Sequence, residues 1–367
     1  MDPRLTTLAQ TLLGYSLSLG PGAKLLIEGE TGCEPLVREI LAEGYRRGVE
    51  PFFELTDPLL RRAWLLGAGD EQLALKFSLD IERLRAVDAR VMILAGNNMN
   101  EMSDVPEDRM LAWSRARHDY MQVVLSKKWS LLRYPTPAGA QAAGMSTEAF
   151  ADFSFAVMAL DYAKMNRAMD PLVTLMERTD QVRLVGPGTD LTFSIAGIPV
   201  MKAAGRMNIP DGEVFTAPVR DSADGIITYN APSLEAGTVF EHVSLTLRDG
   251  RIIEATGTPQ DKLNAQFDID QGARYLGEFA LGVNPLITRP MGDILYDEKI
   301  AGSLHLTPGN AYDDADNGNR SAQHWDLVLI QTPEWGGGEI WFDGVLVRKD
   351  GQFVLPALEG LNPAGLL

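Results

Sequence analysis

Histidine and acidic residues gather in one stretch of the chain, residues 277–326. Two of the four histidines, His305 and His324, lie there, and Glu278, Glu298 and Asp326 are among the carboxylates of the same stretch. His324 and Asp326 form an H-x-D pair at the start of the apolar run WDLVLI. In a strand, residues two apart point to the same face, so this imidazole and carboxylate would project together. Imidazole nitrogen and carboxylate oxygen are ligands that suit zinc, cobalt, manganese or iron, so the stretch predicts a metal site.

Glu213 and Tyr312 add to this candidate site, and the surroundings of Glu278 support its place in it. Glu213 lies in NIPDGEVFTAP, after a Pro-Asp-Gly turn and at the head of an apolar strand. Glu278 lies in ARYLGEFALG, which we predict to be a helix with apolar neighbours that imply burial. A buried carboxylate needs a cation or a hydrogen-bond partner, because an unpaired one is costly. Tyr312 follows His305 by seven positions.

Several other kinds of site are excluded by missing motifs. The sequence has no G-x-x-x-x-G-K-[ST] phosphate loop, no H-E-x-x-H helix and no G-x-S-x-G elbow. The glycines of EGETG and GPGTD make no dinucleotide fingerprint and indicate turns. The single cysteine, Cys33, has no histidine close in sequence, so we interpret it as a small apolar residue.

The composition is that of a globular protein of one large or two ordinary domains. Of 367 residues, 45% are hydrophobic, and the net charge of −17 disfavours binding to nucleic acid or to an anionic membrane. One cysteine permits no internal disulfide, and no apolar run approaches the roughly 20 residues of a membrane helix. The first 20 residues lack the pattern of a signal peptide, so a cytoplasmic protein is expected.

The first half of the chain alternates between strand and helix patterns. Expected strands are 24–28, 49–55, 89–95 and 129–134, and expected helices are 3–18, 35–47, 71–86 and 110–126. This order predicts a parallel sheet with helices on both faces. Residues 146–179 are expected to be mostly helical, with a break or kink at Pro171.

Short strands follow residue 180, at 182–185, 191–195, 225–229, 239–248 and 251–256. Asp249-Gly250 at the centre of LTLRDGRIIEAT predicts a tight hairpin. The fold class predicted is α/β with two domains, an N-terminal parallel-sheet α/β domain over residues 1–178 and a C-terminal mixed α+β catalytic domain over residues 179–367.

The second half resembles the thermophilic aminopeptidase family of dinuclear metallopeptidases, the group of aminopeptidase T and aminopeptidase S. The resemblance is carried by NIPDGEVFTAPVRDSADGIITYN, by ARYLGEFALGVNPLITRPMGDILYDEKIAGSLHL, by GNAY and by QHWDL. The first half agrees in layout and in fragments such as LLIEGE.

This resemblance implies a role for each candidate residue. The implied metal ligands are Glu213, Glu278, His305, His324 and Asp326. Glu278 is the implied bridge between two ions, Glu298 a further carboxylate near them, and Tyr312 a tyrosine that assists catalysis. His118 and His242 match nothing functional. The resemblance also implies a homodimer, with an N-terminal domain that narrows access to the site and supports the dimer.

The residue chemistry agrees with that role. Five or six ligands exceed the four of a tetrahedral zinc and suffice for two divalent ions about 3.5–4 Å apart, which lower the pKa of a bridging water to about 7. The residues do not decide between zinc, cobalt and manganese. The proton of that water could go to Glu298 or to a free oxygen of Glu213, and Tyr312 could donate to the oxyanion. The expected activity is removal of N-terminal residues from peptides.

Two other functions stay open on the sequence. His305, His324 and Asp326 also form a 2-His-1-carboxylate set, as in mononuclear non-haem iron ring-cleaving dioxygenases. Such a site would not need Glu213 or Glu278. The second alternative is a non-catalytic binding protein on the same fold, in which some ligands would be expected to be lost.

Overall fold

The strand–helix alternation of the first half builds a parallel sheet. The computed structural model describes residues 2–235 and 237–367, and these form two compact units. The first unit contains the chain up to Ala159 together with Gly205–Pro210. Its five strands lie in the order β2-β1-β3-β4-β8 and all pair in parallel. They are β1 (Lys24–Glu30), β2 (Glu50–Thr56), β3 (Ala89–Leu94), β4 (Lys128–Arg133) and β8 (Asn208–Ile209).

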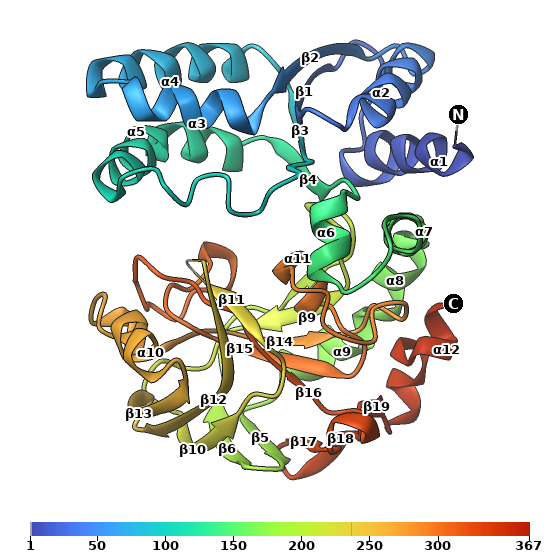
Figure 1. Ribbon diagram of the computed structural model, residues 1–367. Coiled ribbons are helices and arrows are strands. Elements are labelled where there is room, and N and C mark those ends of the chain that lie inside the picture. The colour runs from blue at the N-terminus through green and yellow to red at the C-terminus, as the bar shows by residue number, and fades with distance from the viewer. Residues whose placement is uncertain (1, 236) are drawn as a thin grey trace. The chain divides into compact units, whose positions relative to one another are not determined.

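Helices cover both faces of this sheet, as predicted (Figure 1). The helices of the first unit are α1 (Pro3–Thr11), α2 (Glu34–Arg46), α3 (Pro58–Gly67), α4 (Asp70–Arg85), α5 (Glu107–Leu125), α6 (Pro137–Ala142) and α7 (Thr147–Met158), with a π-helical turn, η1 (Leu12–Ser16), after α1. In β1, Leu26 packs with Phe77 and Tyr120 of α4 and α5, while its neighbours Leu25 and Ile27 are fully buried. A strand buried on both faces needs an unbroken apolar run, which β1 supplies.

The second unit contains Leu160–Ala204 and Asp211–Leu367 and is built on two antiparallel sheets. Sheet B runs in the order β11-β12-β10-β6-β5-β17-β18-β19, with β13 paired to β12. Its strands are β5 (Gln181–Gly186), β6 (Thr189–Ser194), β10 (Asp224–Thr228), β11 (Ser233–Glu235), β12 (Thr238–Arg248), β13 (Arg251–Thr258), β17 (Glu339–Phe342), β18 (Val345–Lys349) and β19 (Gln352–Phe353). The predicted hairpin is confirmed, since Asp249 and Gly250 join β12 to β13 with positive φ.

Sheet C runs in the order β16-β15-β14-β9-β7 and carries most of the candidate site. Its strands are β7 (Met201–Ala203), β9 (Glu213–Thr216), β14 (Leu276–Gly282), β15 (Ser303–Pro308) and β16 (Leu327–Ile330). Phe193 of β6 and Phe279 of β14 meet edge to face with ring centroids 5.0 Å apart, and both are buried, so sheets B and C pack against each other.

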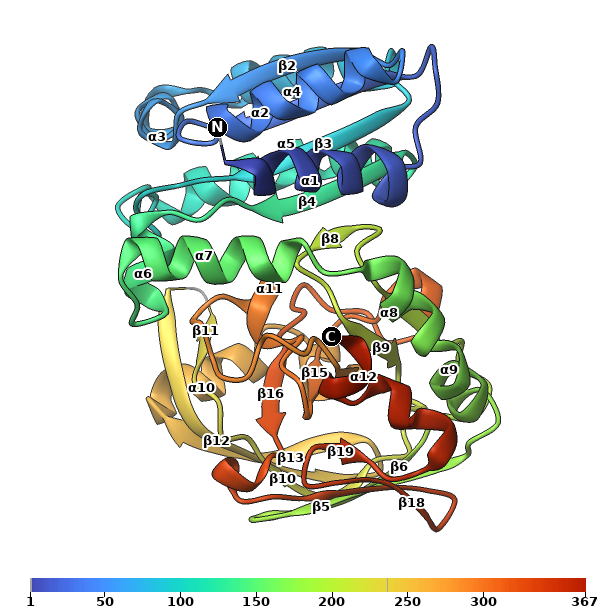
Figure 2. The same ribbon diagram turned by 90° about the vertical axis from the view of Figure 1, so that its right-hand side faces the viewer.

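Short helices complete the second unit. They are α8 (Tyr162–Ala168), α9 (Asp170–Met176), α10 (Gln260–Phe267), α11 (Ile294–Asp297), α12 (Pro363–Leu366) and the 3₁₀ turns η2 (Gly272–Arg274), η3 (Asp313–Ala315), η4 (Pro333–Trp335) and η5 (Pro356–Leu361), several of which can be followed in Figure 2. The break expected at Pro171 is present, because this proline lies in the first turn of α9. No helix in the described part of the chain is long and apolar enough to cross a membrane.

The compact units divide between Ala159 and Leu160, so α8 and α9 belong to the second unit. The sequence places its domain boundary near residue 178. Residues 205–210 also return to the first unit, where Asn208 and Ile209 pair with Leu131 and Leu132. The assignment of separate roles to residues 1–178 and 179–367 stays a prediction.

The predicted helix around Glu278 is wrong. Glu278 lies in β14, all seven residues of which are buried, between β9 and β15 in sheet C. A short apolar run without alternation fits a buried helix as well as a buried strand, so periodicity alone could not decide. Pairing along both edges of β14 fixes it as a strand.

Candidate metal centre

The register of sheet C turns three acidic and imidazole side chains to the same face. Glu213 at the start of β9 lies opposite Gly282 of β14, and His305 of β15 lies opposite Ala280. Residues opposite each other, and residues two apart on one strand, share a face. Glu213, Glu278 and His305 therefore converge on one face of sheet C.

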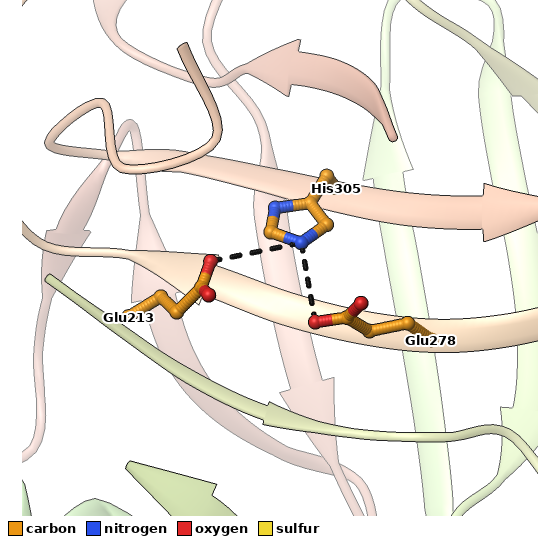
Figure 3. Close-up of side chains that lie close together, drawn as sticks. All are labelled: Glu213, Glu278 and His305. Atoms are coloured by element: carbon orange, nitrogen blue, oxygen red, sulfur yellow. Dashed lines mark hydrogen bonds and ion pairs between the residues drawn. The ribbon is translucent and has the colours of Figure 1, made fainter. Parts of the chain in front are cut away.

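These three side chains meet at close distances (Figure 3). His305 Nε2 lies 3.4 Å from Glu278 Oε1 and 3.6 Å from Glu213 Oε2. All three are buried, with exposed fractions of 1% for His305, 3% for Glu278 and 6% for Glu213. Glu213 Oε2 is buried without a hydrogen-bond partner among the described residues. The group has room for an atom that accepts lone pairs from all three.

A second group shares Glu278. His324 and Asp326 precede β16, and His324 Nε2 lies 3.2 Å from Glu278 Oε2 and 3.3 Å from Asp326 Oδ1. Thr307, opposite Glu278 on β15, donates a 2.5 Å hydrogen bond to Asp326 Oδ1 and holds that carboxylate in place. The H-x-D pair thus reaches one site although it lies just before β16 and not, as the sequence predicts, within the strand.

The tautomer of His324 is fixed by a backbone contact. Its Nδ1 lies 2.8 Å from the carbonyl oxygen of Asn310, which can only accept, so Nδ1 carries the hydrogen. In the neutral ring Nε2 is then the unprotonated nitrogen, and it faces carboxylate oxygens of Glu278 and Asp326. Lone pairs facing each other in a buried site need a cation or a proton between them. Orientation of an imidazole by a carbonyl on its other nitrogen is usual for metal ligands.

Glu298, at the end of α11, enters a third group. Glu298, His305 and Asp326 each offer one ligand atom within 4.8 Å of the others, as do the groups Glu213–Glu278–His305 and Glu278–His324–Asp326. In the described part of the chain these are the groups of three or more such residues, and His118 and His242 are in none of them. The six acidic and imidazole residues named from the sequence therefore lie together.

Tyr312 borders the second group. Its ring lies against that of His324 with centroids 4.5 Å apart, and against Phe215 of β9 at 5.8 Å. The tyrosine is 47% exposed, unlike the buried carboxylates. It stands where a molecule arriving from solvent could meet both its ring and the metal-binding groups.

Lys299 is a residue that the sequence analysis missed. It is 1% exposed, and its Nζ lies 2.5 Å from Glu213 Oε1, 2.7 Å from Glu298 Oε1 and 3.5 Å from Asp211 Oδ1. In the sequence it belongs to the charged run YDEK, which resembles a solvated surface segment. Its position directly after Glu298 and before the apolar Ile300 is the signal that could have drawn attention to it.

The charges of the site balance two divalent cations. The carboxylates of the three groups and of Asp211 are five, and the Lys299 ammonium is one, which leaves a formal charge of −4 with neutral histidines. Two divalent ions carry the opposite charge. The donor set, the facing lone pairs and this balance fit a pair of divalent metal ions.

The raised pKa values of the site also indicate that it favours added positive charge. Burial raises the pKa of Glu213 to about 7 and that of Glu298 to about 8, although the Lys299 ammonium opposes both shifts. Burial lowers the pKa of His305, but its hydrogen bond with Glu278 and the charge of Glu213 outweigh this and raise it to about 9. Without another cation, the cluster takes up protons.

Comparison with known proteins gives one consistent set of similarities. A family model described as thermophilic metalloprotease (M29) matches residues 1–353. Aminopeptidase 2 of Geobacillus stearothermophilus is 24% identical, over 96% of this chain and 95% of that protein. Aminopeptidase T of Thermus aquaticus is 25% identical, over 93% and 94%. The solved structure of wild-type AmpT from Thermus thermophilus superposes with a TM-score of 0.80 at 23% identity, over 96% of this chain and 100% of that one, which shows a shared fold.

Proposed function

The chain belongs to the thermophilic metalloprotease family M29, and we propose that it is a metal-dependent aminopeptidase that removes N-terminal residues from peptides through two divalent ions. Family membership implies a divalent metal. The relatives named aminopeptidase support exopeptidase activity. The observation that carries the two-ion assignment is that Glu278 belongs to two separate groups of possible ligands.

The proposed ligands are Glu213, Glu278 and His305 for one ion, and Glu278, His324 and Asp326 for the other. Glu278 offers Oε1 to the first group and Oε2 to the second, which supports its role as the bridge. When bound, such ions lower the pKa of water and polarise a peptide carbonyl. Zinc, cobalt and manganese all suit these ligands.

The remaining side chains have proposed roles around the ions. Glu298, held through Oε1 by Lys299, accepts a proton from the attacking water and returns it to the leaving amine as the C–N bond breaks. Tyr312 donates a hydrogen bond to the developing oxyanion.

The dioxygenase alternative is less well supported. A mononuclear iron site would use His305, His324 and Asp326 alone, yet Glu213 and Glu278 approach the same imidazoles. A non-catalytic binding protein would not need to retain every group of the site. The proposed homodimer, supported by the N-terminal domain, rests on the resemblance, and sedimentation equilibrium tests it. The proposed cytoplasmic location rests on the sequence pattern, and cell fractionation tests it.

The experiment that tests the proposal compares two alanine variants. Glu278→Ala removes a ligand common to both groups, so we expect loss of both ions and of activity. Glu213→Ala removes a ligand of one group, so we expect one ion to be retained. Elemental analysis after gel filtration in metal-free buffer counts the ions, and circular dichroism checks folding.

The control is Glu254→Ala, a change in β13 outside the site. It should keep two ions and full hydrolysis of aminoacyl amides after reconstitution with zinc, cobalt or manganese. Two ions and full activity in Glu278→Ala would refute the bridge. Wild-type protein that binds two ions and hydrolyses no aminoacyl amide in a broad panel would refute the aminopeptidase.

A further inference from the structure

Arg348 is a buried cation without a counter-charge. It lies in β18 and is 0% exposed. Other buried cations have acidic partners: Arg90 pairs with Glu28, and Lys299 contacts three carboxylates. Across residues 2–235 and 237–367, no carboxylate lies within ion-pair distance of Arg348 in the structure. Burial lowers the pKa of Arg348 to about 9, so the guanidinium still carries its charge at pH 7.

Most hydrogen-bond donors of this guanidinium lack an acceptor. Nη2 donates to Gln331 Oε1 at 3.2 Å, whereas Nε and Nη1 are buried without a partner among the described residues. Gln331 is itself 1% exposed, and its Nε2 is also without a partner. A guanidinium and an amide that are hydrogen-bonded to each other thus present several N–H groups that lack an acceptor. Buried donors of this kind call for an acceptor.

The surroundings are apolar and small. The ring of Phe353 lies under the guanidinium, with 5.7 Å from Arg348 Cζ to the ring centroid. Gly338 lies beside the amide, where a Cβ would stand 2.5 Å from Gln331 Nε2. The amide therefore packs directly against the glycine backbone, and the guanidinium and the amide are both shielded from solvent.

We propose that Arg348 and Gln331 bind a small monovalent anion of halide size, with chloride as the ordinary occupant. A water molecule would accept hydrogen bonds but would leave a fully desolvated positive charge unbalanced, and such a charge is costly in a protein interior. A monovalent anion supplies both the acceptor and the charge. A single-atom anion is the smallest species that supplies both, and both side chains are buried.

The position of the site explains what the anion would do. Gln331 directly follows β16 of sheet C, and its N–H donates to the carbonyl of Gly302, next to β15. Arg348 belongs to sheet B. The anion would therefore join the two sheets of the second unit near the strand that carries His305. Since it binds the folded protein only, it stabilises that state as its concentration rises.

The test uses wild-type protein with saturating metal, at fixed pH and ionic strength, with sodium chloride exchanged for sodium gluconate. The melting temperature should rise with the logarithm of chloride concentration, by about 5 °C at a hundredfold excess over Kd. In crystals grown with bromide, an anomalous peak should lie beside Nε and Nη1 of Arg348. A melting temperature indifferent to chloride, together with no bromide peak, would overturn the proposal and leave water as the acceptor.

Two variants locate the effect. Arg348→Met should abolish the chloride dependence and the bromide peak. Lys349→Met, one residue further along β18 and half exposed beside Glu339, should keep both. Chloride dependence that survives in Arg348→Met would place the anion elsewhere and refute the assignment. If Arg348→Met fails to fold, the bromide peak of the wild type still decides. These readouts do not involve peptidase activity, so they stand apart from the proposed function.

Discussion

Removal of the Lys299 charge should destabilise the metal-free protein in a pH-dependent way. The substitution Lys299→Met keeps an unbranched side chain in a position that is 1% exposed, so it changes charge more than packing. It deletes the ammonium that contacts Glu213, Glu298 and Asp211. In protein stripped of metal, these buried carboxylates then lose a compensating cation.

The magnitude follows from the burial of the partners. Removing one member of a buried ion pair typically costs about 3–5 kcal/mol of unfolding free energy. Here the cost is limited because the carboxylates can protonate: burial already raises the pKa of Glu213 to about 7 and of Glu298 to about 8. We therefore expect a deficit of about 3 kcal/mol at pH 8.

The sign of the pH dependence can be worked out from the same groups. A carboxyl group whose folded pKa lies above its unfolded value lowers stability as pH rises from the unfolded pKa to the folded one. Without Lys299 the folded pKa values of Glu213 and Glu298 rise further, so the loss continues to higher pH. The deficit of the variant should thus be smaller at pH 6 than at pH 8, by about 1 kcal/mol or more.

The assay is urea unfolding of chelator-treated protein at pH 6 and pH 8, followed by tryptophan fluorescence. The matched control is Lys202→Met in the same unit, which removes a more exposed ion pair with Asp170 and should cost at most about 1 kcal/mol. A Lys299→Met protein as stable as this control at pH 8 would refute the compensation. A deficit of equal size at both pH values would indicate lost packing instead of lost charge.

Two further predictions concern Tyr312 and Cys33. Tyr312→Phe should retain metal and lower kcat by about 10²-fold, the effect of losing one oxyanion donor, which steady-state kinetics and elemental analysis can measure; unchanged turnover would remove Tyr312 from the mechanism. Burial raises the pKa of the Cys33 thiol to about 12, so at pH 8 the native protein should react with a thiol reagent at least about 100-fold more slowly than urea-unfolded protein. Rapid labelling of native protein would contradict that burial.

The regular elements of the first unit could be predicted because they are local. Strands β1, β2, β3 and β4 follow one another along the chain with one or two helices between each pair, and this order is enough to indicate a parallel sheet. The fifth strand, β8, could not be predicted from the sequence. Residues Asn208 and Ile209 carry no periodic pattern, and they pair with β4 only because the chain returns from the second unit.

The sequence indicated the candidate ligands individually, but it did not indicate the groups that hydrogen-bond to them. His324 and Asp326 are two apart, and Glu213 and Glu278 lie in long motifs that the resemblance covers. Thr307 and the Asn310 carbonyl, which orient Asp326 and His324, carry no such mark. Each orients a candidate ligand by a hydrogen bond, and it can do so only where the pairing of β14 with β15 brings the two groups together.

Arg348 shows how a bulge in a sheet can bury a charged residue that strict alternation would expose. In VLVRKD near a hairpin turn, strict alternation would bury one residue and expose the next. Instead, the register between β17 and β18 shifts by one residue. Ile340 pairs with Arg348, whereas the next residue of β17, Trp341, pairs with Leu346. Val347 is the extra residue of a bulge, and Val347 and Arg348 are both fully buried as a result. A bulge is decided by the partner strand as well as by the residues within it. An isolated reading of β18 would therefore place this guanidinium in water, where it would need no anion.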